Sequence, residues 1–208
     1  MTIDIDEVKV ERNEFGLWLG WTLATAGGML LGFLPTIPLV NLLDLGIAQI
    51  AVPVLAGTVI GFAQWIVLRR YLTAGSTWEL ADGITWAAGY VLGLLLVLAL
   101  PSTLFIATIA YLLFGVIVAL VQWPVLRREI PNILVWIAAN AFGWAIGFWA
   151  SQAILPLFVT DPLAPPAVGT AVIAVTSGLV AGAITGIALV WIVRKPELVY
   201  EYETPAPR

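Results

Sequence analysis

The longest stretch of this chain without a charged residue runs from Gly83 to Leu126, between Asp82 and Arg127. A helix needs about 20 apolar residues to cross the hydrocarbon core of a bilayer, so this stretch has room for two crossings. The sequence Pro-Ser-Thr at 101–103 divides it and provides a turn. Only 11% of the residues are charged and 61% are hydrophobic, whereas soluble domains carry about 25% charged residues. The chain is therefore predicted to be an integral membrane protein.

Apolar runs separated by charged or proline-rich breaks predict an all-α fold with six membrane-spanning helices. The predicted spans are 15–34, 47–70, 82–100, 103–127, 133–156 and 167–194. They form one transmembrane domain over 15–195, with an N-terminal tail at 1–14 and a C-terminal tail at 196–208. The N-terminal tail lacks the basic segment of a secretory signal peptide, so we expect the first span to act as its own insertion signal.

The basic residues predict the orientation of the spans. Lys9 and Arg12 precede the first span, two arginine pairs follow the second and fourth spans, and the remaining basic residues follow the sixth. All nine therefore fall on one side of the predicted arrangement. Because short cytoplasmic segments are enriched in lysine and arginine, we expect both termini in the cytoplasm and three short loops outside.

One sequence pattern ends the second and fourth spans, as QWIVLRR from Gln64 and QWPVLRR from Gln122. A reduced third copy, VWIVRK, begins at Val190 near the end of the sixth span. The odd-numbered spans share a tryptophan seven residues before a glycine. The three copies are WTLATAGG from Trp21, WAAGYVLG from Trp86 and WIAANAFG from Trp136. These patterns predict a helical hairpin repeated three times in parallel, unlike the inverted repeats of many transporters.

The repeated basic and aromatic residues are typical of helix ends at a membrane surface. Arginine and lysine side chains extend from helix ends to the lipid headgroups, and tryptophan one turn deeper prefers the interface. The residues expected to anchor the helices are Trp65, Arg69, Arg70, Trp123, Arg127, Arg128, Trp191, Arg194 and Lys195. The tryptophans of the odd-numbered spans are expected in the same aromatic belt. Binding of anionic lipid by these residues is the alternative interpretation.

Small residues four positions apart predict where helices meet. Pairs such as Gly28/Gly32 and Gly57/Gly61 occur in most spans, and the fourth span has Gly115 four residues before an alanine. In lipid, small residues let two backbones approach closely, which favours helix association. We interpret these pairs as helix-packing contacts, with oligomerisation as the alternative.

Polar residues inside the spans are costly and therefore informative. The predicted repeat places Gln64 and Gln122 at one level, and Thr25, Tyr90 and Asn140 at a corresponding level of the odd-numbered spans. We expect these five residues to form a polar layer in the cytoplasmic third of the membrane. Two interpretations stay open: hydrogen bonds that hold helices together, or a site whose amide oxygens bind a cofactor's metal or a small polar ligand.

Missing residue types restrict the chemistry. The chain has no cysteine and no histidine, so haem ligation through histidine and thiolate metal sites are excluded. Its two lysines, Lys9 and Lys195, lie at predicted span ends, which excludes a retinal Schiff base. No acidic or basic residue falls in the middle of a predicted span, which disfavours a proton-coupled pump. With no recognisable catalytic set, we expect a protein that is not an enzyme.

The segments QWIVLRR, QWPVLRR and VWIAANAFGWAIGFW resemble a group of bacterial multi-pass membrane proteins that are frequent in photosynthetic phyla. In that group, Q-W-L-V-L-R-R is followed by W-x-x-A-[NS]-x-x-G-W. The resemblance covers most of the chain, although the third copy departs from it at Val190 and Arg194. It implies the fold and a location in a bacterial inner or photosynthetic membrane, and it implies no activity.

Two function classes remain from the sequence. The first is an accessory or scaffold subunit that associates with a larger membrane complex, with another copy of itself, or with an apolar pigment or lipid. Its ten tryptophans, glycine-rich helices and short loops favour this class. The alternative is a solute-binding or transport subunit of a modular importer, whose energy would come from a partner. Membrane lipids are expected partners in both cases, and nucleic acid in neither.

Overall fold

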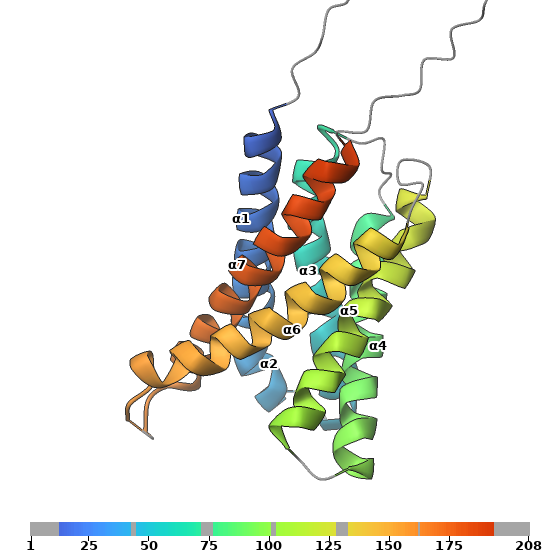
Figure 1. Ribbon diagram of the computed structural model, residues 1–208. Coiled ribbons are helices and arrows are strands. Elements are labelled where there is room, and N and C mark those ends of the chain that lie inside the picture. Colours follow the sequence, from blue (N-terminus) through green and yellow to red (C-terminus); the bar gives the residue numbers. More distant parts are fainter. Residues whose placement is uncertain are drawn as a thin grey trace, which may run out of the picture.

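The computed structural model describes residues 13–42, 45–71, 77–100, 103–127, 133–161 and 163–193. Within these ranges the chain is all-α (Figure 1). The helices are α1 (Glu14–Phe33), α2 (Thr36–Leu42), α3 (Leu45–Leu68), α4 (Trp78–Ala99), α5 (Leu104–Leu126), α6 (Ile133–Phe158) and α7 (Pro166–Val193). Residues 1–12 of the predicted N-terminal tail, the whole predicted C-terminal tail and the anchors Arg128, Arg194 and Lys195 lie outside the described residues.

Five helices, α1, α3, α5, α6 and α7, contain segments that are long and apolar enough to cross a membrane. The remaining long helix, α4, has 22 residues, or about 33 Å at 1.5 Å per residue, which also matches a hydrocarbon core of about 30 Å. Polar side chains start two of the helices. The Asn13 carboxamide oxygen accepts from the Gly16 amide at 2.8 Å, and the Thr103 hydroxyl accepts from Ile106 at 3.2 Å.

Two boundaries differ from the sequence-based expectation. The helix predicted from residue 82 begins at Trp78, so Asp82 lies inside α4 and not at its entrance. The connection after the first span contains the short helix α2, in which the Thr36 hydroxyl donates to the Phe33 carbonyl oxygen at 2.6 Å.

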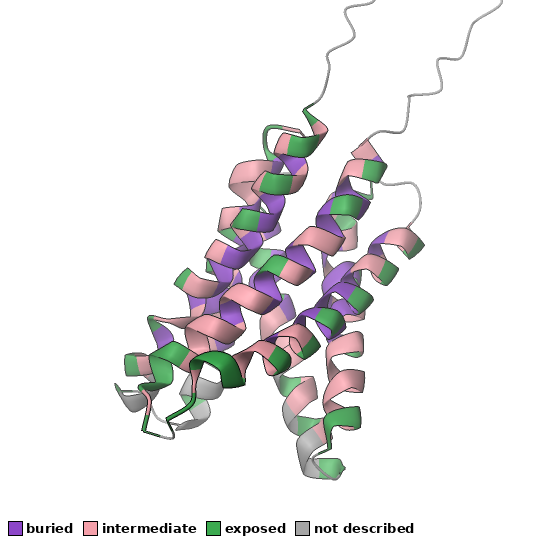
Figure 2. Ribbon diagram, turned by 60° about the vertical axis from the view of Figure 1, so that its left-hand side comes forward, coloured by how far each residue is buried: buried purple, intermediate pink, exposed green. Residues whose placement is uncertain are grey.

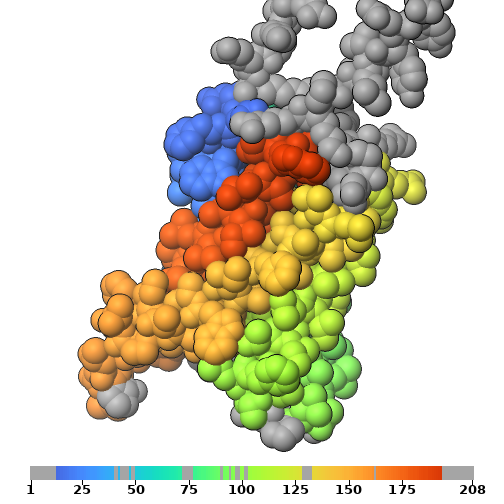
Figure 3. All heavy atoms as spheres, viewed as in Figure 1, coloured from blue at the N-terminus to red at the C-terminus, as the bar shows by residue number. Residues whose placement is uncertain are grey.

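The six long helices form a closed ring. Going round it, α1 packs on α3, α3 on α4, α4 on α5, α5 on α6, α6 on α7, and α7 again on α1. The start of α1 and the end of α7 lie at the same end of the bundle, at the top of Figure 1. Side chains of α5, α6 and α7 form one continuous face of the molecule (Figure 3).

Burial is uneven along the ring (Figure 2). Helices α1, α6 and α7 carry buried residues over most of their length. Among the side chains that are described, α4 has none that is buried after Thr85, and α5 has none before Phe114. The hairpin formed by the end of α4 and the start of α5 is therefore packed on the other helices mainly at the end where the termini lie.

Several predicted small-residue pairs are close contacts between helices. A Cβ atom on Gly28 would lie 2.8 Å from the Ile60 Cα atom, and one on Gly32 would lie 2.8 Å from the Ala56 carbonyl oxygen. Gly115 lies directly against the Asn140 backbone. Gly93, by contrast, has no neighbour within 4 Å of such a Cβ atom in the described part of the chain. The interpretation as packing contacts is confirmed for Gly28, Gly32 and Gly115.

The adjacent glycines Gly27 and Gly28 provide a matched test of this packing. We expect Gly28→Ala to lower the free energy of unfolding by about 1–3 kcal/mol, because the added methyl group overlaps the α3 backbone. Gly27→Ala should be neutral or raise it by roughly 0.5–1 kcal/mol, because open space surrounds Gly27 and alanine favours the helix. Denaturant unfolding in detergent, followed by circular dichroism, measures both. Equal effects would contradict the packing described here.

Candidate functional site

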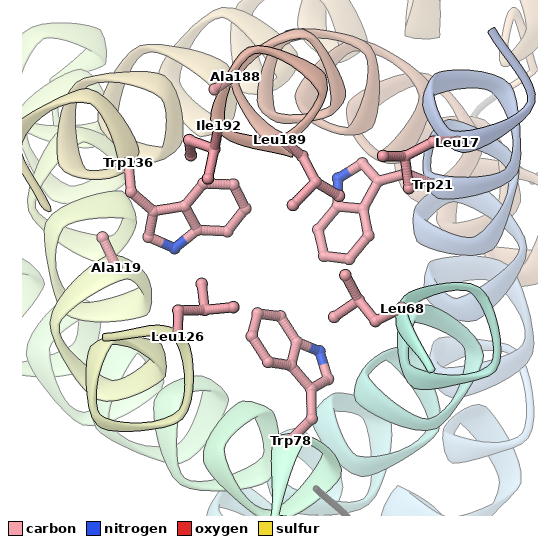
Figure 4. Close-up of a cluster of buried hydrophobic side chains, with 10 residues drawn as sticks. All are labelled: Leu17, Trp21, Leu68, Trp78, Ala119, Leu126, Trp136, Ala188, Leu189 and Ile192. Atoms are coloured by element: carbon pink, nitrogen blue, oxygen red, sulfur yellow. The ribbon is translucent and has the colours of Figure 1, made fainter. Parts of the chain in front are cut away.

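Three tryptophans meet in the middle of the ring, near the end where the termini lie. Trp21, Trp78 and Trp136 are at most 2% exposed and belong to one buried cluster. Figure 4 shows them alternating around the centre with three leucines, Leu68, Leu126 and Leu189. The Trp21 ring contacts the other two edge to face, with centroid distances of 5.9 Å to Trp78 and 6.1 Å to Trp136. The helices of the first, third and fifth predicted spans, α1, α4 and α6, thus each contribute one indole to a common layer.

Each of these indoles donates a hydrogen bond to a side chain of the neighbouring helix. Trp78 Nε1 donates to Gln64 Oε1 at 3.1 Å, and Trp136 Nε1 donates to Gln122 Oε1 at the same distance. In both pairs the partners are 14 residues apart in the sequence. Trp21 Nε1 donates to Thr185 Oγ1 at 2.8 Å, which joins α1 to α7. One type of contact therefore recurs at three helix pairs of the ring.

This arrangement corrects the predicted correspondence between the odd-numbered spans. The counterpart of Trp21 and Trp136 is Trp78, and the expected residue Trp86 lies eight positions further along α4. The sequence holds the matching signal, since WTLAT, WELAD and WIAAN each place a polar residue four positions after the tryptophan. These tryptophans also do not belong to a belt facing lipid, because all three are buried.

The structure also changes which residue of α7 corresponds to Gln64 and Gln122. Gly61 of α3 lies against Asp82 of α4, and Gly182 of α7 lies in the same way against Thr25 of α1. Thr185 follows Gly182 by three residues, as Gln64 follows Gly61. Thr185 is therefore the counterpart of the glutamines, and Val190, which the sequence had suggested, is not.

The indole bonds fix the orientation of both glutamine amides. An indole N–H can only donate, so each amide must present its oxygen to the tryptophan and its NH₂ group to the opposite side. Gln64 Nε2 donates to Thr25 Oγ1 at 3.1 Å. Gln122 Nε2 donates to Asp82 Oδ1 at 2.6 Å. The second chain of hydrogen bonds, from Trp136 through Gln122, thus ends on a carboxyl group.

A small cavity lies beside these polar groups. It offers about 10 Å³ to the centre of a water-sized sphere, which is room for about one water molecule. Its polar lining comes from every long helix of the ring. The lining side chains with polar groups are Thr25, Gln64, Asp82, Gln122, Asn140 and Thr185, together with the indoles Trp21, Trp86 and Trp144.

A second aromatic cluster lies on the other side of the cavity. The Trp86, Phe114 and Trp144 rings contact one another edge to face, with centroids 4.9 to 5.4 Å apart. Trp86 and Trp144 also line the cavity, as does Trp21 of the first layer. The polar groups are therefore enclosed between two layers of aromatic side chains, with about one water molecule's volume between them.

The structure brings together four of the five predicted polar residues. Thr25, Gln64, Gln122 and Asn140 all line the cavity, and each is at most 4% exposed. The side chain of Tyr90 lies outside the described part of the chain. Asn140 Nδ2 donates to the Trp136 carbonyl oxygen at 2.9 Å.

Asp82 is the residue that the sequence-based reasoning missed. It is 3% exposed and lies among the polar groups of the cavity. The sequence placed Asp82 at the entrance of a span, whereas it lies in the second turn of α4, because α4 begins one turn earlier than predicted. The second of these tryptophan segments, WELAD, could have identified it, since Asp82 stands where Thr25 and Asn140 stand in the other two.

The predicted anchors that are described lie at helix ends. Arg69, Arg70 and Arg127 are exposed, and the Arg69 guanidinium lies 4.9 Å from the centre of the Trp65 ring. Trp65 and Trp123 are partly buried against the tryptophan layer, and Trp191 is 45% exposed. Contacts of these residues with lipid headgroups stay a prediction.

An apolar groove lies on the outside of the bundle between α3 and α4. It has a volume of about 590 Å³. Small residues of α4 line it, among them Gly83, Ala87 and Ala88, and larger side chains such as Ile50 and Leu95 lie around them. Its one hydroxyl group, on Thr58, already donates to the Val54 carbonyl oxygen at 2.8 Å. The groove is therefore suited to an apolar surface.

No protein-family model, no curated protein and no solved structure matches this chain. The arrangement described above therefore rests on the residues of this chain alone.

The indole–amide contact can be measured with a double-mutant cycle. We expect Trp78→Phe and Gln64→Leu to show a coupling free energy of about 0.6–1.7 kcal/mol, because the two groups share one buried hydrogen bond in an apolar environment. The matched control combines Trp78→Phe with Gln122→Leu. These two residues share no hydrogen bond, so their coupling free energy should be near zero. Unfolding in detergent measures both cycles. Equal coupling in the two cycles would contradict the pairing.

Proposed function

We propose that this protein is a non-enzymatic accessory or scaffold subunit that holds an apolar molecule, a lipid or a pigment, in the groove between α3 and α4. The groove itself is the observation that carries the proposal. Its volume of about 590 Å³ falls within the range of ligand sites, which is about 300–1,000 Å³. Nearly all of its lining is hydrocarbon, and the small residues of α4 let a flat or elongated molecule approach the backbone.

The interior of the bundle supports this class over the solute-binding alternative. A solute-binding subunit needs a polar cavity of solute size, whereas the enclosed cavity holds about one water molecule. The cavity is also too small for a pigment whose metal is bound by Gln64 or Gln122. In addition, both amide oxygens face indoles inside the bundle. The groove on the outer face is where an apolar ligand fits.

The proposed subunit crosses the membrane six times, with both termini in the cytoplasm of a bacterial cell. The positive-inside distribution supports this orientation, since all nine basic residues belong to one side of the arrangement. The recurring tryptophan contacts support an origin of the bundle from three parallel hairpins, in the register Trp21, Trp78 and Trp136. Reporter fusions to each terminus and loop would test the orientation.

The test of the groove uses two isoleucines of nearly equal exposure. Ile84 lines the groove and is 60% exposed, and Ile187 of α7 is 63% exposed and lies outside it. We expect wild-type protein purified in mild detergent to retain a stoichiometric lipid or pigment. Ile84→Trp should reduce its occupancy at least about fivefold, because the indole fills part of the groove, and Ile187→Trp should leave it unchanged.

Mass spectrometry of the intact complex and an absorption spectrum of the same sample measure the occupancy. A wild-type protein without any bound apolar molecule would contradict the proposal. So would equal losses in the two variants. Stabilisation by a small polar solute in a thermal-shift screen would instead support the solute-binding alternative.

A further inference from the structure

Asp82 places a carboxyl group inside the bundle. Its carboxyl group is 3% exposed, and Gln122 Nε2 is the one hydrogen-bond donor to it that the structure describes. Within the described ranges, no lysine or arginine forms an ion pair with it. A buried carboxylate with a single neutral donor is strongly destabilising in an apolar environment, so either a proton or a bound cation must neutralise it.

We propose that the cavity beside Asp82 binds one small monovalent cation of the size of Na⁺. This site is separate from the α3–α4 groove, and the proposal of a cation site does not depend on the proposed accessory function. The Asp82 carboxylate supplies the charge, and neutral oxygens from the other helices of the ring supply the remaining ligands.

The hydrogen-bond directions leave oxygen atoms for such an ion. Each amide around the cavity donates one described hydrogen bond: Gln64 to Thr25, Gln122 to Asp82 and Asn140 to the Trp136 carbonyl oxygen. Thr25 and Thr185 donate their hydroxyl protons to backbone carbonyl oxygens of their own helices. The oxygens of Thr25, Thr185 and Asn140 therefore keep acceptor capacity beside the carboxyl group of Asp82, whereas the amide oxygens of Gln64 and Gln122 face indoles.

The size and charge of the cavity favour a monovalent ion. A volume of about 10 Å³ admits one water-sized species, which excludes a cation that keeps several waters, as Mg²⁺ does. Ca²⁺ sites usually combine several carboxylates, and no group of three or more acidic, histidine or cysteine side chains surrounds a common point in the described structure. One carboxylate balances one positive charge.

A second acidic residue lies one turn closer to the start of α4. Glu79 and Asp82 both contact Gly61 of α3, and the buried Glu79 Oε2 has no hydrogen-bond partner in the described structure. Two carboxyl groups along one face of α4 give this side of the bundle a negative potential, which favours the approach of a cation.

The experiment measures thermal unfolding of purified protein in detergent at pH 8 while Na⁺ replaces N-methyl-D-glucamine at constant ionic strength. Wild-type Tm should rise with Na⁺ by about 3 °C for each tenfold increase above Kd. Asp82→Asn keeps an oxygen for Gln122 but removes the charge, and we expect it to lose this dependence. Asp161→Asn, at an exposed aspartate outside the helices, should behave like wild type.

Equilibrium dialysis of the wild type with ²²Na⁺ is the second measurement and needs no variant. We expect one ion per chain, displaced by excess unlabelled Na⁺. A Tm that changes with pH and not with Na⁺ would mean that a proton alone neutralises Asp82, and would overturn the proposal. It is also overturned if no ion binds, or if Asp82→Asn responds to Na⁺ as wild type does.

Discussion

The hydrogen bond from a buried indole to a side-chain oxygen is the contact on which this bundle depends. In lipid, apolar surface does not drive helices together, so close packing and polar contacts must do so. Here the indole N–H of Trp78 has an amide oxygen as its partner, and that partner decides where the amide's NH₂ group points. One contact between two helices thereby orients a second contact to a third helix.

Three such contacts surround a common centre, but their ends are different. The chain from Trp78 ends on a threonine hydroxyl, and the chain from Trp136 ends on the Asp82 carboxyl group. The contact of Trp21 ends on Thr185, whose hydroxyl proton goes to its own helix. The indole contact thus recurs at three helix pairs, whereas a carboxyl group takes part in only one of the three. The carboxyl group of Asp82 therefore has no equivalent at the other two contacts.

Much of the fold could be predicted from the sequence, because apolar length and glycine spacing act locally along each helix. The start of α4 could not, because Glu79 and Asp82 resemble the charged border of a span until their partners across the bundle are known. The same applies to Trp86, which has the expected spacing to a glycine and yet belongs to a different layer from Trp21. Four of the five polar residues were predicted correctly as neighbours, since Gln64 and Gln122 occupy equivalent positions in the best repeat. Asp82, whose carboxyl group lies beside them, could be identified only from the alignment of the helices in three dimensions.

The closure of the ring has a consequence for the order in which the protein is assembled. Trp21 lies in α1, and its partner Thr185 lies 164 residues later in α7. Trp78 and Trp136, by contrast, follow their partners Gln64 and Gln122 by 14 residues, so each finds its partner already made. The indole of α1 therefore enters the membrane before its partner exists, and α7 supplies that partner when it is made. A chain that stops before α7 lacks Thr185, so α7 both closes the ring and satisfies the buried indole N–H of Trp21.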